Sequence, residues 1–177
     1  MHRLFVGIRP PAALRRQMLD VMGGVPNARW QDDDQLHLTL RFIWEVDRHV
    51  AEDVATSLNA VHHPRFTLSL GELGVFERKG RAHTLWIRGE PFAHLRELQK
   101  KVDRALARVG FEPESRAFLP HITIARLGAS AAPVSPFLTH TAAPVGSAGV
   151  TDFCLFESDL GRTGPTYSII SRYPLAE

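Results

Sequence analysis

Hydrophobic positions near the start of the chain predict a buried strand followed by an amphipathic helix. An unbroken apolar run over 4–8 ends at Arg9 and two prolines, which is typical of a buried strand that leads into a helix with proline in its first turn. Apolar residues then recur at helical spacing over 11–22 and stop at two glycines, a common helix end.

The two periods continue to the end of the chain and indicate the α+β class. We expect further strands over 36–44, 66–71, 84–87, 118–127, 150–157 and 167–173, and further helices over 49–61 and 91–109. Turn residues over 161–165 favour a hairpin between the last two strands. No period is visible over 74–83, 112–116 and 128–149, so we expect loops there, the longest of them mobile.

One short motif occurs twice. His37-Leu38-Thr39-Leu40 returns as His121-Ile122-Thr123-Ile124, 121 − 37 = 84 residues later. Successive side chains of a strand point to opposite faces, so the His and Thr of each copy share one face while the aliphatic residues face the core. An apolar run and an amphipathic segment precede each copy. The chain is therefore interpreted as an internal duplication of a strand, helix and strand.

The paired motif suggests acid–base chemistry. Imidazole titrates close to neutrality and gives or takes a proton, and a hydroxyl two residues later can bind a substrate oxygen. Two such strands facing each other across a cleft would place an acid and a base on opposite sides of a substrate.

Composition limits the other classes of function. With 177 residues, 44% of them hydrophobic, the chain suits one domain spanning 1–177, built as two small lobes around one cleft. A net charge of +2 is too small to identify a polyanion binder. The single Cys154 excludes an internal disulfide and a cysteine-based zinc site. No apolar run approaches a membrane span or the core of a signal peptide, so we expect a cytoplasmic protein.

Basic and aromatic residues gather in the segment 74–83. Phe76, Arg78, Lys79 and Arg81 lie there beside two glycines. Basic groups next to an aromatic ring can hold an RNA backbone and stack a base. A merely solvated loop explains the same pattern equally well.

Two other polar clusters have a plain structural interpretation. The run Asp32-Asp33-Asp34 is expected to be a solvated loop without metal, because three adjacent carboxylates cannot all point at one ion. His62-His63-Pro64 is expected to be an exposed turn rather than a metal site. We therefore predict no metal and no cofactor.

With these motifs the chain resembles the two-histidine phosphoesterase superfamily, and within it the RNA 2′,3′-cyclic phosphodiesterases of the 2′-5′ RNA ligase type. The matching segments run nearly end to end: Leu4-Phe5-Val6, Ala28-Arg29-Trp30, His37-Leu38-Thr39-Leu40-Arg41-Phe42, Leu85-Trp86, Gly110-Phe111, Pro120-His121-Ile122-Thr123-Ile124-Ala125-Arg126 and Leu155-Phe156-Glu157-Ser158. The segment after Gly128 departs from the family pattern.

The resemblance implies a bilobal α+β fold whose antiparallel sheets form a V-shaped cleft with helices outside. It implies metal-free opening of an RNA 2′,3′-cyclic phosphate, with His37 as proton donor and His121 as proton acceptor. Thr39 and Thr123 would then contact phosphate oxygens. Family positions that bind substrate fall on two further residues, Phe42 and Arg126.

The chemistry required agrees with these roles. Opening a cyclic phosphodiester requires a base for the attacking water, an acid for the departing ribose oxygen, and donors to the anionic phosphate. Phe42 and Arg126 lie five residues beyond their histidines, an odd offset that strict alternation would send to the other face. We expect a bulge or a strand end to turn them back.

Three functions remain as hypotheses. The first is hydrolysis of RNA cyclic-phosphate ends to the 2′-phosphomonoester, by a protein expected to be a monomer with no obligate protein partner. The second is action on a small cyclic nucleotide or ADP-ribose cyclic phosphate, or joining of 2′-5′ RNA ends in reverse. The third is a non-catalytic RNA-binding module, which would not require two titratable groups.

Overall fold

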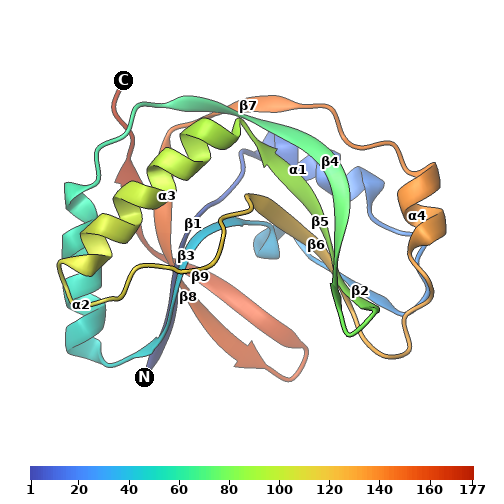
Figure 1. Ribbon diagram of the computed structural model, residues 1–177, viewed down its shortest axis with the longest axis horizontal. Coiled ribbons are helices and arrows are strands. Elements are labelled where there is room, and N and C mark those ends of the chain that lie inside the picture. The colour runs from blue at the N-terminus through green and yellow to red at the C-terminus, as the bar shows by residue number, and fades with distance from the viewer.

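The computed structural model describes residues 1–177 and confirms an α+β protein. Nine strands form one curled antiparallel sheet in the order β7-β4-β5-β6-β3-β1-β8-β9, with β2 paired to β6 (Figure 1). The strands are β1 His2–Ile8, β2 Ala28–Trp30, β3 Leu38–Val46, β4 Phe66–Arg78, β5 Arg81–Glu90, β6 His121–Leu127, β7 Ser147–Val150, β8 Asp152–Gly161 and β9 Gly164–Pro174. The helices are α1 Ala12–Val21, α2 Arg48–Ser57, α3 Phe92–Ala107 and α4 Ser135–His140, with short 3₁₀ turns η1 Asp33–Gln35 and η2 Leu58–Ala60.

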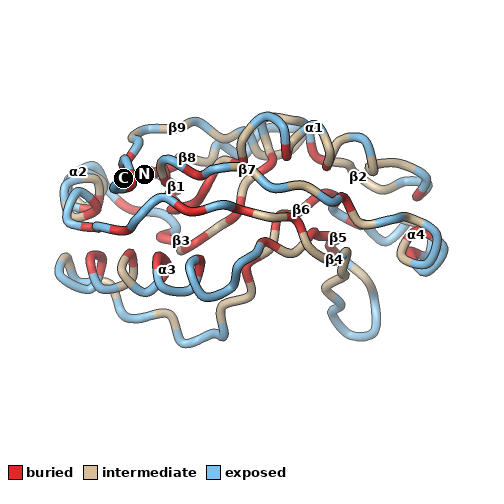
Figure 2. Tube along the Cα trace, turned by 90° about the horizontal axis from the view of Figure 1, so that it is seen from above, coloured by how far each residue is buried: buried red, intermediate tan, exposed pale blue.

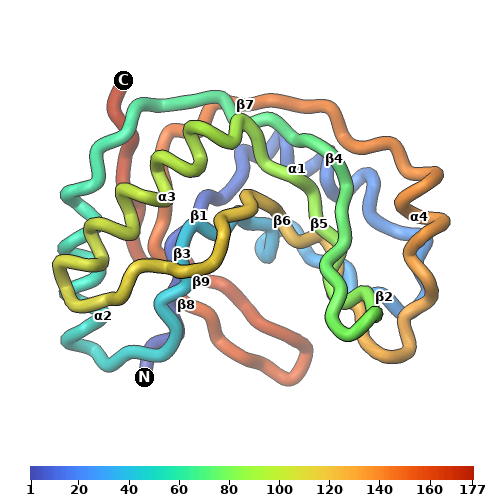
Figure 3. Tube along the Cα trace, in the orientation of Figure 1, coloured from blue at the N-terminus to red at the C-terminus, as the bar shows by residue number.

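The main path of the sheet consists of two halves of four strands each. One half is β3, β1, β8 and β9, and the other is β6, β5, β4 and β7. Each half contains one strand, helix and strand unit, β1-α1-β3 and β5-α3-β6. In Figure 3 the C-terminal β8–β9 hairpin, drawn in red, lies beside the blue β1 and completes the first half. The two expected sheets are therefore joined edge to edge.

The join between the halves is narrow. β3 and β6 share one backbone pair, Leu38 with Ile122, and both side chains are fully buried. Leu38 also lies against β5, because a Cβ added at Gly89 would be 2.5 Å from its Cδ1 atom. Aliphatic packing at this point fixes how the two halves meet.

Helices cover the core side of the sheet. Helix α3 packs on β3 and β5 through its buried stripe of Leu95, Leu98, Val102 and Leu106, as its sequence period predicts. Helix α1 buries Leu14 and Met18. Seen from above in Figure 2, α1 and α3 lie along opposite edges of the molecule, with the buried residues between them.

The first strand is buried on both faces, which explains its continuous apolar run. Leu4 and Val6 join the main core, whereas Phe5 points the other way and packs with Cys154 and Phe156 in a second, smaller cluster. This second cluster lies beside His37, since the Phe5 and His37 ring centroids are 4.7 Å apart.

The prediction of a loop over 74–83 is wrong. β4 and β5 run through it as one long hairpin that turns at Lys79 and Gly80, whose φ angles of 52° and 73° are both positive. Two consecutive positive φ values suit a two-residue hairpin turn. Figure 1 shows this hairpin and the β8–β9 hairpin extending to the same side of the molecule. The outer parts of both strands are exposed, so no core-facing alternation marked them.

Two other expectations are also wrong in part. The segment 128–149 contains helix α4 and the start of β7, which pairs with β4. Its one buried aromatic residue, Phe137, packs against Trp30 with ring centroids 5.5 Å apart. The segment has too few buried apolar residues to give a visible sequence period. In the expected exposed turn, His63 is 1% exposed and meets the stacked rings of Phe66 and His94 edge-on. No helix is long and apolar enough to span a membrane.

Leu38→Ala tests the join between the halves. Removing a fully buried side chain leaves a cavity, so the free energy of unfolding should fall by about 2–5 kcal/mol. Urea unfolding followed by circular dichroism measures the change. Leu160→Ala, at a position 67% exposed, is the control and should shift it by less than about 0.5 kcal/mol. Equal small effects from both variants would contradict the role given to this pair.

Candidate active site

The repeated motif brings two histidines and two threonines together at the join between the halves. Antiparallel pairing of Leu38 with Ile122 sets His37 opposite Thr123 and Thr39 opposite His121. Directly opposed residues have Cβ atoms about 4.5–5.5 Å apart. Each imidazole therefore has as its cross-strand neighbour the hydroxyl of the other copy.

Both imidazoles are held in the same way. His37 Nδ1 lies 2.7 Å from the carbonyl oxygen of Gln35, and His121 Nδ1 lies 2.7 Å from the carbonyl oxygen of Leu119. A carbonyl only accepts, so Nδ1 carries the proton and donates in each case. The Nε2 atom of each ring is then left unprotonated in the neutral form and free to exchange a proton.

Both histidines have lowered pKa values and are neutral near pH 7. Burial lowers the pKa of His37 to about 4, with smaller contributions from the positive charges of Arg126, His121 and Arg9, while the bond to the Gln35 carbonyl opposes the shift. Burial and Arg126 also lower the pKa of His121, against the bond to the Leu119 carbonyl. The positive charge of Arg126 also attracts an anion, and a bound anion would raise both pKa values again.

Aromatic rings surround His37. The ring centroid of Phe5 is 4.7 Å from that of His37, and Tyr167 meets the imidazole edge-on at 4.8 Å. Phe156 stacks on Phe5 with centroids 4.8 Å apart. These contacts, made by β1, β8 and β9, restrict the ring to one orientation.

The other half supports His121 differently. Phe76 meets its imidazole edge-on with centroids 4.9 Å apart, and Trp86 lies 6.1 Å away. The Trp86 ring lies over Gly74 of the neighbouring strand, where an added Cβ would be only 2.2 Å from a ring carbon. Glycine at 74 is therefore required for Trp86 to reach this position.

Beta bulges turn Phe42 and Arg126 toward the histidines, as expected. Gly7 pairs with Thr39 and Phe5 with Phe42. A step of two residues along β1 therefore matches a step of three residues along β3. In the other half Trp86 pairs with Thr123 and Thr84 with Arg126. The extra residue on β3 and on β6 compensates for the odd offset, and Thr39 shares a face with Phe42 as Thr123 does with Arg126.

Two adjoining hollows form the cleft, and Phe42 lines both. The hollow that contains His37, of about 420 Å³, is lined by Arg3, Leu4, Phe5, Arg29, His37, Phe42, Trp44, Arg126, Ser158, Leu160, Pro165 and Tyr167. The hollow that contains His121, of about 470 Å³, is lined by Thr39, Leu40, Arg41, Phe42, Phe76, Gln99, Glu114, Arg116, Ala117, Phe118, Leu119 and His121. A substrate bound across Phe42 would reach both histidines.

Three arginines give the His37 hollow a positive charge. Arg3, Arg29 and Arg126 line it, none has a carboxylate within ion-pair distance, and no Asp or Glu lines the hollow. Arg126 Nη1 donates to Thr84 Oγ1 at 3.3 Å, and Arg29 is its cross-strand partner on β2. Unpaired guanidinium groups in a half-closed hollow attract phosphate.

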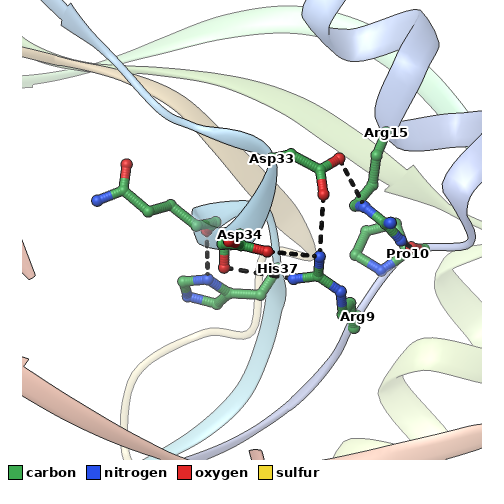
Figure 4. A network of polar contacts seen from close by, with 7 residues as sticks. Arg9, Pro10, Arg15, Asp33, Asp34 and His37 are labelled. Carbon is green, nitrogen blue, oxygen red and sulfur yellow. Dashed lines mark hydrogen bonds and ion pairs between the residues drawn. The ribbon is translucent and has the colours of Figure 1, made fainter. Parts of the chain in front are cut away.

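The acidic run is not a solvated loop, which corrects the sequence-based expectation. Asp33 bridges two arginines: its Oδ2 accepts from Arg9 at 3.0 Å and its Oδ1 from Arg15 at 2.9 Å (Figure 4). Arg9 also donates to the carboxylate and carbonyl oxygens of Asp34. This network anchors turn η1, whose Gln35 supplies the carbonyl that orients His37.

Gln35 also ties the turn to the β8–β9 hairpin. Its side-chain nitrogen donates to the Pro165 carbonyl at 2.8 Å, and its side-chain oxygen accepts from the Asp32 amide at 3.0 Å. The turn that orients His37 is thus fixed to the hairpin that carries Tyr167.

The candidate RNA contacts separate into two places. Phe76 lies against His121 inside the cleft. Arg78 and Arg81 line another hollow, of about 520 Å³, with His83 and part of the segment after Leu127, and Lys79 forms the exposed turn. The four residues share a hairpin but do not form one surface.

No group of three or more His, Cys, Asp or Glu side chains is placed to hold a metal ion. Metal independence stays a prediction for an assay to decide.

Sequence reasoning missed three residues of the cleft: Arg3, Arg29 and Tyr167. Arg29 lies in a segment that carried the family resemblance and Arg3 directly precedes another, but nothing local gave either a role. Tyr167 reaches His37 only because β9 folds back on β8 and β8 pairs with β1. A cross-strand arrangement of this kind leaves no signal in short-range periodicity.

The curled antiparallel sheet with two inward His-x-Thr strands defines a two-histidine phosphoesterase. Residues 9–162 match the family model described as the 2′-5′ RNA ligase superfamily. The chain belongs to this family.

Named relatives cover most of the chain. It is 36% identical over 151 residues to the RNA 2′,3′-cyclic phosphodiesterase of Aeropyrum pernix, a match over 83% of this chain and 85% of the relative. It is 29% identical over 183 residues to the protein of the same name from Escherichia coli K12, with coverage of 99% and 97%.

Solved structures share the fold. The chain superposes on E. coli LigT complexed with 3′-AMP with a TM-score of 0.80 and 29% identity, covering 99% of each chain. The protein TT0787 of Thermus thermophilus gives a TM-score of 0.82 over 97% of each chain, and at 23% identity it shows the fold alone.

Proton NMR of the imidazole rings tests the electrostatics of the cleft. His37 and His121, assigned from His37→Asn and His121→Asn, should both titrate below the ordinary value of 6.5 in the free protein, His37 near pH 4. Inorganic phosphate should raise the pKa of both rings, because a bound anion stabilises the imidazolium. Titration of either ring above 6.5 without phosphate, or no response to phosphate, would contradict this account.

Proposed function

We propose that the protein hydrolyses the 2′,3′-cyclic phosphate end of RNA to a 2′-phosphomonoester. The observation that carries the proposal is the pair of imidazoles, each with Nδ1 bonded to a backbone carbonyl and Nε2 free, in one cleft beside unpaired arginines. Relatives named RNA 2′,3′-cyclic phosphodiesterase support the same activity.

In the proposed mechanism the two histidines move two protons. His121 Nε2 accepts a proton from the attacking water as its oxygen bonds to phosphorus. His37 Nε2 donates a proton to the ribose 3′-oxygen as the bond from that oxygen to phosphorus breaks. Each transfer contributes about 10²- to 10⁴-fold to the rate. The histidines exchange charge states during the reaction and return to their starting states through solvent.

The lowered pKa of His121 suits a base directly, whereas His37 can act as an acid only after a bound substrate has raised its pKa. A low pKa keeps His121 neutral and able to accept a proton. His37 has to be charged to donate, and burial holds its pKa at about 4 in the protein alone. The anionic cyclic phosphate raises that pKa by Coulomb attraction, so binding itself prepares the donor.

The remaining site residues are assigned to the phosphate and the nucleoside. Neither Thr39 nor Thr123 has a hydrogen-bonded side chain in the protein, so both hydroxyls are free for phosphate oxygens, and Arg126 adds a charge-assisted donor as negative charge builds up. Phe42, exposed by 42% between the two hollows, offers its ring face to the substrate.

One observation favours a second reaction at the same site. The His121 hollow, of about 470 Å³, is far larger than one attacking water requires, about 30 Å³. An RNA 5′-hydroxyl in place of the water would give a 2′-5′ phosphodiester by the same proton transfers, with the bond to the 3′-oxygen broken. A panel of RNA ends with and without a 5′-hydroxyl acceptor distinguishes joining from hydrolysis.

We further propose that residues 1–177 act as one domain and as a monomer in the cytoplasm. The halves share a core cluster of 35 buried residues, which supports one folding unit. Cys154 is buried and unpaired, and burial raises the pKa of its thiol to about 12, so it requires no oxidising compartment.

The function is tested with an oligonucleotide that ends in a 2′,3′-cyclic phosphate, incubated in EDTA, with the product identified by mass spectrometry and phosphatase sensitivity. We expect a 2′-phosphate end and no stimulation by added divalent metals. His37→Ala and His121→Ala should each lower kcat by at least about 10²-fold with unchanged circular dichroism, and the double variant should be little worse. A 3′-phosphate product, loss of activity in EDTA, or near-normal turnover in either variant would contradict the proposal.

Arg126 and the basic hairpin tip should act on different parts of the substrate. Arg126→Ala removes a charge-assisted contact of about 1.5–3 kcal/mol and should lower kcat/KM about 10- to 150-fold even for a mononucleoside cyclic phosphate. Replacing Arg78, Lys79 and Arg81 together by Gln should mainly raise KM for an RNA of about ten nucleotides and flatten its salt dependence. Equal losses on both substrates from the tip variant would argue against this division.

A further inference from the structure

An exposed aromatic pair lies at the outer end of the hollow that contains His37. Trp44 is 50% exposed and Phe42 is 42% exposed, and their rings stack with centroids 5.1 Å apart. The guanidinium carbon of Arg3 lies 5.4 Å from the centroid of the Trp44 ring. Exposed rings beside a guanidinium are the surfaces on which single-stranded bases stack.

The backbone of Trp44 is held in an unfavourable conformation. Its φ angle is 68°, in the left-handed region that residues other than glycine rarely adopt. The other two such residues, Asn27 and Lys79, lie in turns, whereas Trp44 lies within β3 beside a bulge. A large aromatic residue at such a position is costly for folding, and strain of this kind concentrates at binding sites.

The proposed mechanism decides which side of the cleft receives the nucleoside. His37 protonates the departing ribose oxygen, so the ribose lies on the His37 side, and water attacks from the His121 side. The RNA chain leaves that ribose through its 5′-oxygen and continues in the same hollow. Thr39 pairs with Gly7 and Trp44 with Leu4, which are three residues apart on β1, about 10 Å along a strand, so Trp44 lies beyond the terminal nucleoside.

The charge of this hollow fits an RNA chain. Its three arginines have no carboxylate partner, and no acidic residue lines it. Glu45 is the cross-strand neighbour of Arg3, and the two side chains form no ion pair. Arg3 is therefore free to contact a phosphodiester.

We propose that Trp44 and Arg3 form a subsite for the nucleotide that precedes the cyclic-phosphate end. The base of that nucleotide takes the place of the Arg3 guanidinium over the Trp44 ring, and Arg3 turns to contact the phosphodiester that joins it to the terminal nucleoside. This inference rests on the proposed function and adds which residues hold the second nucleotide of the RNA chain. Stacking on any base makes the subsite tolerant of sequence.

Steady-state kinetics on two substrates test the subsite: a mononucleoside 2′,3′-cyclic phosphate and a dinucleotide that ends in one. The wild-type kcat/KM should be about 5- to 100-fold higher for the dinucleotide, the range expected for one stacked base. Trp44→Ala should abolish most of that gain and affect the mononucleoside far less. Trp44→Phe should keep most of it, and Arg3→Gln should reduce it and flatten the salt dependence.

Two variants separate binding from folding. Trp44→Gly removes the ring but adopts a φ of 68° without strain, so it should lose the dinucleotide gain while Tm does not fall. Ile170→Ala removes an exposed side chain of β9 that does not line the hollow and should leave both substrates unaffected.

Distinct outcomes separate this proposal from the proposed function. Equal wild-type kcat/KM for both substrates, or equal losses on both from Trp44→Ala, would overturn the subsite and leave the hydrolase intact. If neither substrate were hydrolysed, the proposed function would fail. Fluorescence anisotropy of a fluorescein-labelled dinucleotide cyclic phosphate would then decide the subsite, which stands only if Trp44→Ala weakens binding about 5-fold or more.

Discussion

The antiparallel pairing of Leu38 with Ile122 is the interaction on which the site depends. It is the one pair joining β3 to β6, and it sets each histidine opposite the threonine of the other copy. Side chains alternate with a period of two, so a shift by one residue would send a histidine and a threonine into the core. Two fully buried aliphatic residues hold the register and, through it, the distance between His37 and His121.

The parts of this site that follow from local periodicity were predictable from the sequence. His37 shares a face with Thr39, and His121 with Thr123, because they are two residues apart on a strand. Arg126 shares a face with His121 only because of a bulge. The odd offset of five residues between them indicated a bulge but did not locate it. Arg29 could not be assigned, since its place in the cleft depends on β2 pairing with β6, a contact between segments almost a hundred residues apart.

The fold class and the two repeated units were predicted correctly, whereas the outer hairpin was not. Sequence periodicity reports burial, and the ends of β4 and β5 project from the body with exposed side chains. Their backbone hydrogen bonds, not a hydrophobic face, make them strands. The acidic run was misjudged for a related reason: Asp33 meets Arg9 and Arg15 only after the first strand and helix have folded.

The two histidines share one geometry but are held by different forces. The turn behind His37 is fixed by the charged bridge of Asp33 with Arg9 and Arg15, whereas Leu119, which orients His121, is joined to it by a proline and has no such bridge. Ion pairs near the surface weaken as salt screens them, and a prolyl backbone does not. The duplicated halves thus differ in how they respond to salt: screening weakens the support of His37 and leaves the support of His121 unchanged.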